Sequence, residues 1–377
     1  MELSKDQEIA LDEILKWYYS ETDSRKYFTL GGLAGSGKTF LINLITKSIY
    51  DKDIMCKIAH CAYTGKAADV MRRKGISGAS TIHRLIYIPI EEKEGKITFV
   101  KKEKADFDYD LIIVDEASMV GEDIFDDLMS YGIKVLFVGD FGQLPPVGTK
   151  FNLMIEDKLD FKLTTIHRQA LENPIISVSL KVREYGGNSI DYGSYKNKFY
   201  KTIASNLSMK SFLSADQIIC GTNKRRLELN KIYREEKNLS GLPKKGEKLI
   251  ILRNNYSKGV FNGQQIIVAE DFKLQSPIKI EGKFYDPFDE NKKIRKEDFW
   301  VTNFVNTGYV IKEKGLSDAI LADFGYCISV HKSQGSEWDK VLLIDDEGFL
   351  RWDKDAKKKF LYTAFTRAKE KFIWATD

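Results

Sequence analysis

Residues 27–50 read YFTLGGLAGSGKTFLINLITKSIY. The first four residues are apolar and β-prone, residues 31–39 are rich in glycine, and leucine and isoleucine recur at helical spacing after Phe40. This order predicts a strand, a glycine-rich loop and a helix.

The loop of this unit fits the phosphate-binding pattern G-x4-G-K-[ST] through Gly32, Gly37, Lys38 and Thr39. In this pattern, backbone N–H groups surround a phosphate at the amino end of a helix. Lys38 is expected to reach the β- and γ-phosphates, and the Thr39 hydroxyl is expected to bind Mg²⁺. The pattern therefore predicts a nucleoside triphosphate with Mg²⁺ and leaves open what its hydrolysis is used for.

Length and composition favour two core domains with insertions. The chain has 377 residues, of which 43% are hydrophobic. The net charge of +4 is weak evidence for nucleic-acid binding. The four cysteines lack metal-site spacing and lie in apolar runs, so buried thiols without zinc are expected. Without a signal-peptide core or a membrane-length apolar run, a soluble cytoplasmic protein is predicted, in the host cytoplasm if phage-encoded.

Strand and helix patterns extend the α/β prediction along the chain. Residues 111–114 and 135–138 are unbroken apolar runs, typical of a parallel sheet covered on both faces. A second α/β unit is expected to begin near residue 174, with a helix over 174–185, and to resume after residue 318. Residues 241–318 alternate in short segments, which indicates a small antiparallel barrel.

Two further elements are expected in the first part of the chain. Residues 5–19 show helical periodicity, with Ile9, Ile14 and Tyr18 among the residues expected on the buried side. Residues 87–104 read as two short strands around a turn, which predicts a projecting β-hairpin.

Acidic, amide and basic residues follow the later strands, where the catalytic loops of a parallel sheet lie. Asp115 is expected to hold Mg²⁺, and Glu116 to orient and deprotonate the attacking water. Gln143 in GDFGQLPPV is expected to contact the γ-phosphate or its water. Arg168 in LTTIHRQ and Arg367 in LYTAFTRAK are candidates to stabilise transition-state charge, which is worth a rate factor of about 10³ to 10⁵.

Eight segments in this order resemble the motif series of superfamily 1 helicases: GGLAGSGKT, AYTGKAA, STIHRL, IIVDEASM, VGDFGQLPPV, LTTIHRQ, FGYCISVHKSQGSEW and LYTAFTRAK. Their detail is similar to the 5′-to-3′ branch that includes RecD-type and phage Dda-type enzymes, and the resemblance spans residues 7–370. The chain as given shows no long amino-terminal extension and no nuclease signature, so the partner-docking roles of such extensions are not expected here.

The resemblance implies an α/β fold of two RecA-like P-loop domains with parallel sheets, plus an inserted β-hairpin and an inserted small antiparallel β-barrel. The expected bounds are 1–173 for domain 1 with the hairpin at 87–104, 174–240 and 319–377 for domain 2, and 241–318 for the barrel.

The resemblance also implies ATP between the two RecA-like domains. Gln7 would recognise adenine, while Gly335 and Glu337 would border the nucleotide from the second domain. The residues expected around the phosphates are Gly32, Gly35, Ser36, Gly37, Lys38 and Thr39.

Single-stranded DNA is expected to cross both domains. The implied contacts are Thr64, Lys66, Thr81 and His83 in domain 1, and Thr222, Asn223, Ser329, His331 and Lys332 in domain 2. Hydroxyl, amide and basic groups suit phosphate contacts, which position a strand without reading its sequence. Each of these residues is also compatible with a helix cap or a core position, and His83 and His331 with buried imidazoles.

The hairpin lies where relatives carry a strand-separating wedge. Phe99, or its neighbours Ile97 or Tyr87, is expected to stack on the fork base pair, since base–aromatic stacking is worth about 1 to 3 kcal/mol. The alternative is that Phe99 only packs within the hairpin.

The sequence thus predicts an ATP-dependent 5′-to-3′ DNA helicase that translocates on single strands and unwinds duplex. An RNA helicase of the same superfamily, or a nucleotide-switched single-strand clamp that does not unwind, remain alternatives. Expected partners are single-stranded DNA, the duplex fork and single-strand-binding or replication and recombination proteins, for a monomer without membrane contact. The pathway, whether replication, recombination or repair, is left open.

Overall fold

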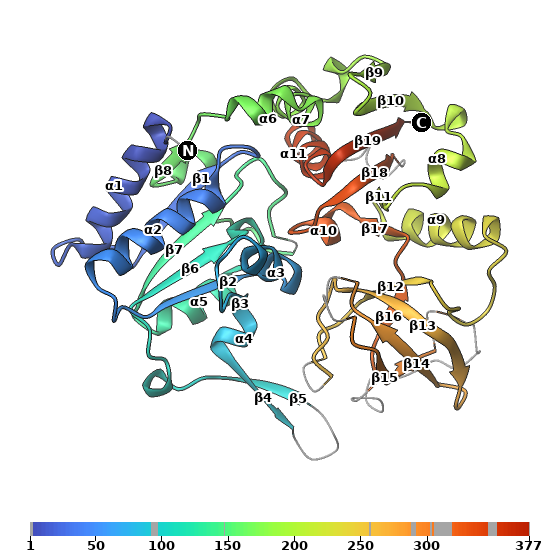
Figure 1. The fold of residues 1–377 in the computed structure, drawn as a ribbon, viewed down its shortest axis with the longest axis horizontal. Coiled ribbons are helices and arrows are strands. Elements are labelled where there is room, and N and C mark those ends of the chain that lie inside the picture. The colour runs from blue at the N-terminus through green and yellow to red at the C-terminus, as the bar shows by residue number, and fades with distance from the viewer. Residues whose placement is uncertain are drawn as a thin grey trace.

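The computed structural model describes residues 3–91, 97–146, 148–255, 258–287, 292–301, 304, 319–345 and 353–376. Within these ranges, the side chains of residues 89, 91, 97–99, 168 and 169 are not described. The described residues form two six-stranded sheets with helices around them, a five-stranded sheet and a two-stranded hairpin (Figure 1). The predicted mixed α/β fold with parallel sheets is confirmed.

The first sheet has the order β3-β2-β6-β7-β1-β8, and all its neighbouring strands are parallel. Its central strands are buried on both faces, as their unbroken apolar sequences predict. The strands are β1 (Tyr27–Gly32), β2 (Ile58–Ala62), β3 (Ser80–Thr81), β6 (Leu111–Asp115), β7 (Lys134–Gly139) and β8 (Phe161–Leu163). The helices are α1 (Lys5–Tyr19), α2 (Lys38–Lys52), α3 (Gly65–Arg73), α4 (Ile82–Ile86) and α5 (Glu122–Ser130), with 3₁₀ turns at Lys104–Asp106, Ala117–Met119 and Glu156–Lys158.

Helix α1 buries a different stripe from the one predicted. Its buried residues are Gln7, Ala10, Ile14 and Trp17, whereas Ile9 is 52% exposed. Ile9 lies five residues before Ile14, which places it about 140° around the helix from the buried stripe. The expectation that Ile9 lines the buried side was therefore wrong.

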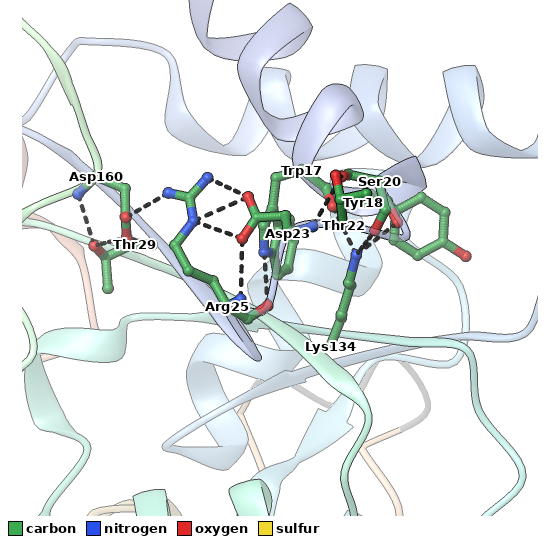
Figure 2. A network of polar contacts seen from close by, with 9 residues as sticks. All are labelled: Trp17, Tyr18, Ser20, Thr22, Asp23, Arg25, Thr29, Lys134 and Asp160. Carbon is green, nitrogen blue, oxygen red and sulfur yellow. Dashed lines mark hydrogen bonds and ion pairs between the residues drawn. The ribbon is translucent and has the colours of Figure 1, made fainter.

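Polar contacts fix the carboxyl end of α1 to the first sheet (Figure 2). Lys134 Nζ, from β7, donates to the carbonyls of Trp17, Tyr18 and Ser20 at 2.7, 3.0 and 2.9 Å. Asp160, just before β8, accepts from the backbone N–H and the hydroxyl of Thr29 on β1. The helix that carries Gln7 is thus held to the sheet that carries the glycine-rich loop.

Replacing Lys134 by methionine is expected to lower the free energy of unfolding by about 1 to 3 kcal/mol, because three carbonyls at the end of α1 lose a charged donor. Urea denaturation followed by circular dichroism measures this change. Lys47→Met, at an exposed position of α2, is the matched control and should change stability little. Equal stability of the two variants would contradict the anchoring role of Lys134.

The second sheet has the order β17-β11-β18-β19-β10-β9, parallel except for the β9–β10 pair. The predicted helix over 174–185 is confirmed, and all four cysteines are buried free thiols as expected. The strands are β9 (Gly193–Tyr195), β10 (Phe199–Ile203), β11 (Gln217–Cys220), β17 (Cys327–Ser329), β18 (Trp338–Ile344) and β19 (Ala368–Thr376). The helices are α6 (Arg168–Glu172), α7 (Pro174–Tyr185), α8 (Met209–Leu213), α9 (Asn223–Glu236), α10 (Val330–Ser333) and α11 (Lys354–Phe365), with 3₁₀ turns at Gly187–Ser189 and Ala204–Asn206.

A five-stranded antiparallel sheet lies between α9 and β17 in sequence, in the order β15-β14-β13-β12-β16. Its strands are β12 (Lys248–Ile251), β13 (Gln265–Leu274), β14 (Lys279–Tyr285), β15 (Arg295–Trp300) and β16 (Ala322–Phe324). A single bridge joins Phe299 of β15 to Ile320, two residues before β16. The chain leading into β16 therefore touches the opposite edge of the same sheet.

The predicted hairpin is formed by β4 (Tyr87–Glu91) and β5 (Ile97–Lys101), and it extends away from the first sheet at the bottom of Figure 1. Its base is anchored to α5, because the Tyr87 hydroxyl and Lys101 Nζ both bond the Asp127 carboxylate. Among the described residues, no helix is both long and apolar enough to cross a bilayer.

Candidate functional site

The glycine-rich loop runs from the end of β1 to the start of α2. Gly35 and Gly37 have φ values of 84° and 80°, which only glycine adopts without strain. A Cβ on Gly37 would lie 2.4 Å from Gln7 Nε2, so this position also has no room for a side chain. The loop thus has the backbone form that the phosphate-binding pattern predicts.

Lys38 rests on the carbonyls of its own loop. Its Nζ donates to Gly32 O at 2.7 Å and to Leu33 O at 3.2 Å. The same nitrogen lies 3.9 Å from Asp140 Oδ2, and that carboxylate is almost fully buried. The ammonium group is therefore located inside the loop, next to the place where phosphates are expected.

Gln7 is buried beneath this loop and uses both ends of its amide within the chain. Its Oε1 accepts from Ser4 N at 3.1 Å, and its Nε2 donates to Ser36 O at 3.0 Å and lies 2.9 Å from His167 Nε2. These contacts place Gln7 at the phosphate loop, and its predicted recognition of adenine stays a prediction. The Ser36 hydroxyl is buried, and no described residue bonds it.

Two carboxylates follow β6. Glu116 has a φ of 54°, a left-handed conformation that is uncommon outside glycine, and its N–H donates to Asp115 Oδ1 at 2.8 Å. Burial raises the pKa of Asp115 and raises that of Glu116 to about 7, while Arg367 opposes the shift of Glu116. Strained backbone and a raised pKa in a buried acid are features of functional sites.

A cavity of about 770 Å³ lies where the two α/β units meet; we call it the interface cavity. It brings together most of the nucleotide residues predicted from distant parts of the sequence. The predicted residues that line it are Gly35, Gly37, Lys38, Thr39, Asp115, Glu116, Gln143, Gly335, Glu337 and Arg367. In the described part of the chain, Gln7, Gly32 and Ser36 lie next to this cavity through the loop but do not line it.

Arg367 reaches the interface cavity from the second unit. Its guanidinium donates to Thr363 O, Ser336 O and Thr366 Oγ1 at 3.0, 3.2 and 3.0 Å. The side chain is 4% exposed and lies close enough to Glu116 to stabilise its charge. Arg367 is thus held by its own unit in the cavity that Asp115 and Glu116 also line.

Arg168 is the first residue of α6, and its side chain lies outside the described residues. The preceding His167 donates its backbone N–H to Gly35 O at 3.2 Å. This contact ties the start of α6 to the phosphate loop, while the role of Arg168 stays a prediction.

Gln143 lies on the loop that follows β7 and is buried. Among the described residues, none bonds its Oε1. The amide oxygen is therefore available to a group that enters the interface cavity.

Thr39 and Asp115 present hydroxyl and carboxylate oxygens to the same cavity. Oxygen ligands fit Mg²⁺, which is commonly held by one or two side chains together with substrate phosphates. The described residues contain no group of three His, Cys, Asp or Glu side chains arranged for a metal ion. The two residues fit a Mg²⁺ ion that arrives with a nucleotide.

Two residues of this site were missed by sequence reasoning, Asp140 and Tyr362. Asp140 directly follows β7 and Asp115 ends β6, and that parallel is the signal that could have found Asp140. Tyr362, on α11, donates to Asp140 Oδ2 at 2.8 Å and accepts from Ala34 N at 2.7 Å. Nothing in the helical pattern of α11 distinguishes Tyr362 from an ordinary core residue.

The hydroxyl residues predicted to contact DNA are all helix N-caps. Thr64, Thr81, Thr222 and Ser329 accept from backbone N–H groups at the starts of α3, α4, α9 and α10, at 3.1, 3.2, 3.2 and 3.4 Å. A cap uses the hydroxyl oxygen as an acceptor, so the O–H can still donate to a phosphate. The cap and the predicted DNA contact are therefore compatible.

Two hollows lie beside these caps, between the first unit and the turn that precedes β13. The larger hollow, of about 330 Å³, includes Lys66, and the smaller, of about 230 Å³, includes His83 and His331. Thr64, Thr81 and Lys332 line both hollows, and so does Phe261, which sequence reasoning missed. The predicted residues Thr222, Asn223 and Ser329 line neither of them within the described chain.

Burial changes the charge of the basic groups in these hollows. It lowers the pKa of Lys66 to about 7, with Lys248 adding to the shift, and that of Lys332 to about 8. It also lowers the pKa values of His83 and His331. Negative charge that enters the hollows would therefore stabilise the protonated forms of these groups and raise their pKa values.

Of the three wedge candidates on the hairpin, the structure describes the side chain of Tyr87 alone. The backbone of Phe99 pairs with Pro89 in the hairpin, and the side chains of Phe99 and Ile97 lie outside the described residues. Tyr87 is bonded to Asp127 and its ring lies 5.6 Å from that of His83. The anchored Tyr87 is thus a poorer candidate for stacking on a base pair, and the role of Phe99 stays a prediction.

A sequence profile for the family described as AAA domain matches residues 2–194, over half of the chain. The chain belongs to this family. A profile for the UvrD-like helicase C-terminal domain matches residues 324–373.

The ATP-dependent RecD2 DNA helicase of Deinococcus radiodurans is 27% identical over 99% of this chain and 49% of its own length. The ATP-dependent DNA helicase Pif1 of Campylobacter jejuni is 24% identical over 90% of this chain and 86% of its own length.

The fold is similar to solved Pif1 structures. A structure described as DNA unwinding at forked dsDNA by two coordinating Pif1 helicases superposes with a TM-score of 0.59, at 20% identity, over 99% of this chain and 92% of the other. The chain is thus similar in sequence to RecD- and Pif1-type helicases and in fold to Pif1, as its motif series predicts. The chain spans about half the length of the RecD2 relative.

Proposed function

We propose that this protein is an ATP-dependent DNA helicase that moves 5′ to 3′ on single strands and unwinds duplex. The observation that carries the proposal is the interface cavity, because it joins Lys38, Asp115 and Glu116 of one unit to Arg367 of the other. A site divided between two units can use nucleotide binding and hydrolysis to change how the units sit together. Relatives named RecD2 and Pif1 DNA helicases support the same activity.

Each residue of the site is assigned one role in phosphoryl transfer. Lys38 and the loop N–H groups would hold the triphosphate of ATP, while Thr39 and Asp115 would hold Mg²⁺, which neutralises charge on the phosphates. Glu116 would accept the proton of the attacking water, and Gln143 would contact the γ-phosphate or that water. Arg367, with Arg168, would stabilise the charge that develops on the γ-phosphate oxygens.

We assign residues 1–173 to the first RecA-like domain, and 174–240 with 325–377 to the second. Residues 241–318 form the inserted barrel in this proposal together with the chain up to the end of β16, because β16 pairs with β12 and the Phe299–Ile320 bridge joins the opposite edges of the five-stranded sheet. The hairpin at 87–104, with Phe99, is proposed as the strand-separating wedge.

The two hollows and the helix N-caps are proposed as the track for single-stranded DNA. Cap hydroxyls and buried lysines contact phosphates, which suits binding without sequence preference. This assignment covers Thr64, Lys66, Thr81, His83, His331 and Lys332 by position. Thr222, Asn223 and Ser329 are added because β11 and β17 are parallel neighbours whose following loops open on one edge.

Strand displacement tests the proposal directly. With ATP and Mg²⁺, two partial duplexes that differ only in a 5′ or a 3′ single-stranded tail are compared by gel. Unwinding of the 5′-tailed duplex alone supports the proposal, and preference for the 3′ tail would contradict the direction. ATP hydrolysis stimulated by DNA without unwinding would favour a clamp or translocase, and stronger stimulation by RNA than by DNA would favour an RNA helicase.

A further inference from the structure

Tyr362 connects the two units at the phosphate loop. Its hydroxyl accepts from Ala34 N at 2.7 Å and donates to Asp140 Oδ2 at 2.8 Å, and the side chain has no exposed surface. Ala34 lies within the glycine-rich loop, two residues after Gly32. One hydroxyl of the second unit thus bonds both the phosphate loop and an acidic residue of the first.

The ring of Tyr362 reaches this position over a glycine. A Cβ on Gly142 would lie 2.8 Å from Tyr362 Cε1 and 2.7 Å from Leu33 Cδ2, so alanine there would displace one of them. The next residue, Thr363, accepts from Leu144 N at 3.0 Å. Two consecutive residues of α11 therefore hold the loop that carries Gln143.

The hydroxyl lies beside the charges that a triphosphate would rearrange. Asp140 Oδ2 is 3.9 Å from Lys38 Nζ, and Lys38 donates to carbonyls of its own loop. A bound triphosphate draws this lysine to its β- and γ-phosphates, and it also competes for N–H groups of the loop. Both changes weaken the hydrogen bonds that the Tyr362 hydroxyl makes with Ala34 N and Asp140 Oδ2.

We propose that Tyr362 is a positioning residue that senses the terminal phosphate: its hydroxyl holds the Ala34 N–H until a γ-phosphate displaces it. The inference rests on the proposed nucleotide site. A diphosphate fills the loop with its β-phosphate alone and leaves the Tyr362 contacts in place, whereas the γ-phosphate of a triphosphate adds negative charge beside Lys38, next to Asp140, which breaks these contacts and frees α11 to shift. Arg367 donates to the carbonyl of Thr363, so a shift of α11 moves the arginine that completes the site.

Competition between the Tyr362 hydroxyl and a bound triphosphate predicts the direction in which a substitution changes nucleotide affinity. Because the hydroxyl opposes the triphosphate and spares the diphosphate, Tyr362→Phe should favour the triphosphate. A net contribution of one hydrogen bond corresponds to a change of about 3- to 10-fold in the ratio of the two affinities.

The test measures the affinities of the full chain for Mg²⁺ with ADP and with a non-hydrolysable ATP analogue, by displacement of a fluorescent nucleotide. Tyr362→Phe should raise the affinity for the analogue relative to ADP. Tyr326→Phe, which removes a distant buried tyrosine contact to Glu247, should leave the ratio unchanged.

An unchanged ratio in a folded Tyr362→Phe variant, or an equal shift in the Tyr326→Phe control, would overturn the inference. If Tyr362→Phe does not fold, Tyr362→Met, which also removes the hydroxyl and can fill the buried space, is used instead; it should shift the ratio in the same direction, and no shift would overturn the inference. Failure of the wild-type chain to bind either nucleotide would instead refute the proposed function.

Discussion

Arg367→Ala is expected to lower ATP turnover by a factor of about 10³ to 10⁵ while nucleotide binding persists. The guanidinium is fixed on the wall of the interface cavity by three hydrogen bonds and lies close to Glu116. In that position it would bind the γ-phosphate oxygens more strongly as charge develops, so its loss acts on the transition state. Steady-state hydrolysis with single-stranded DNA and equilibrium nucleotide binding are the two measurements.

The control for this variant has to separate chemistry from folding. Arg183→Ala removes an arginine of the second unit that pairs with Glu156 and Asp355 away from the interface cavity, and it should keep turnover near the wild-type value. Arg367→Lys keeps the charge but cannot reproduce the three planar hydrogen bonds, so an intermediate rate is expected. Wild-type turnover in Arg367→Ala would refute the assignment.

Glu116→Gln is expected to slow hydrolysis by about 10²- to 10⁴-fold, because the amide cannot accept the proton of the attacking water. The substitution keeps the shape of the side chain, so ATP binding should be retained. Single-turnover hydrolysis of bound ATP measures the chemical step separately from product release.

Glu122→Gln is the matched control for this substitution, because Glu122 is an exposed residue in the first turn of α5. It should hydrolyse ATP like the wild type. A Glu116→Gln variant that does the same would show that another group accepts the proton.

Much of the fold could be predicted because its strands carry local signals. Unbroken apolar runs such as residues 111–114 lie at the centre of a parallel sheet, where both faces are buried. The α1 stripe was misjudged at Ile9, since a helix with mixed apolar residues has two plausible faces until its partner is known. The buried face includes the polar Gln7 together with Ala10, Ile14 and Trp17, and a polar residue gives no hydrophobic signal.

The site was predictable to the extent that its residues lie in contiguous motifs. Lys38, Glu116 and Arg367 were found in this way, and the structure places them around one cavity. Asp140 was missed although it follows a buried strand in the way that Asp115 ends one, whereas Tyr362 and Phe261 were missed because their roles depend on neighbours far away in the sequence. The contact from Tyr362 to Ala34 joins residues 328 positions apart, and no local pattern encodes it.

The buried Lys66 has a consequence for how a strand would bind. Desolvation, with Lys248 nearby, holds the pKa of Lys66 at about 7, so near neutral pH a substantial share of the molecules carries this lysine without its proton. A phosphate placed in the larger hollow would favour the charged form and raise that pKa. Strand binding is therefore expected to take up protons from the buffer, and the affinity for DNA should fall as the pH rises above 7. Calorimetric titrations in buffers of different ionisation enthalpy would report this proton uptake, and Lys66→Met should reduce it.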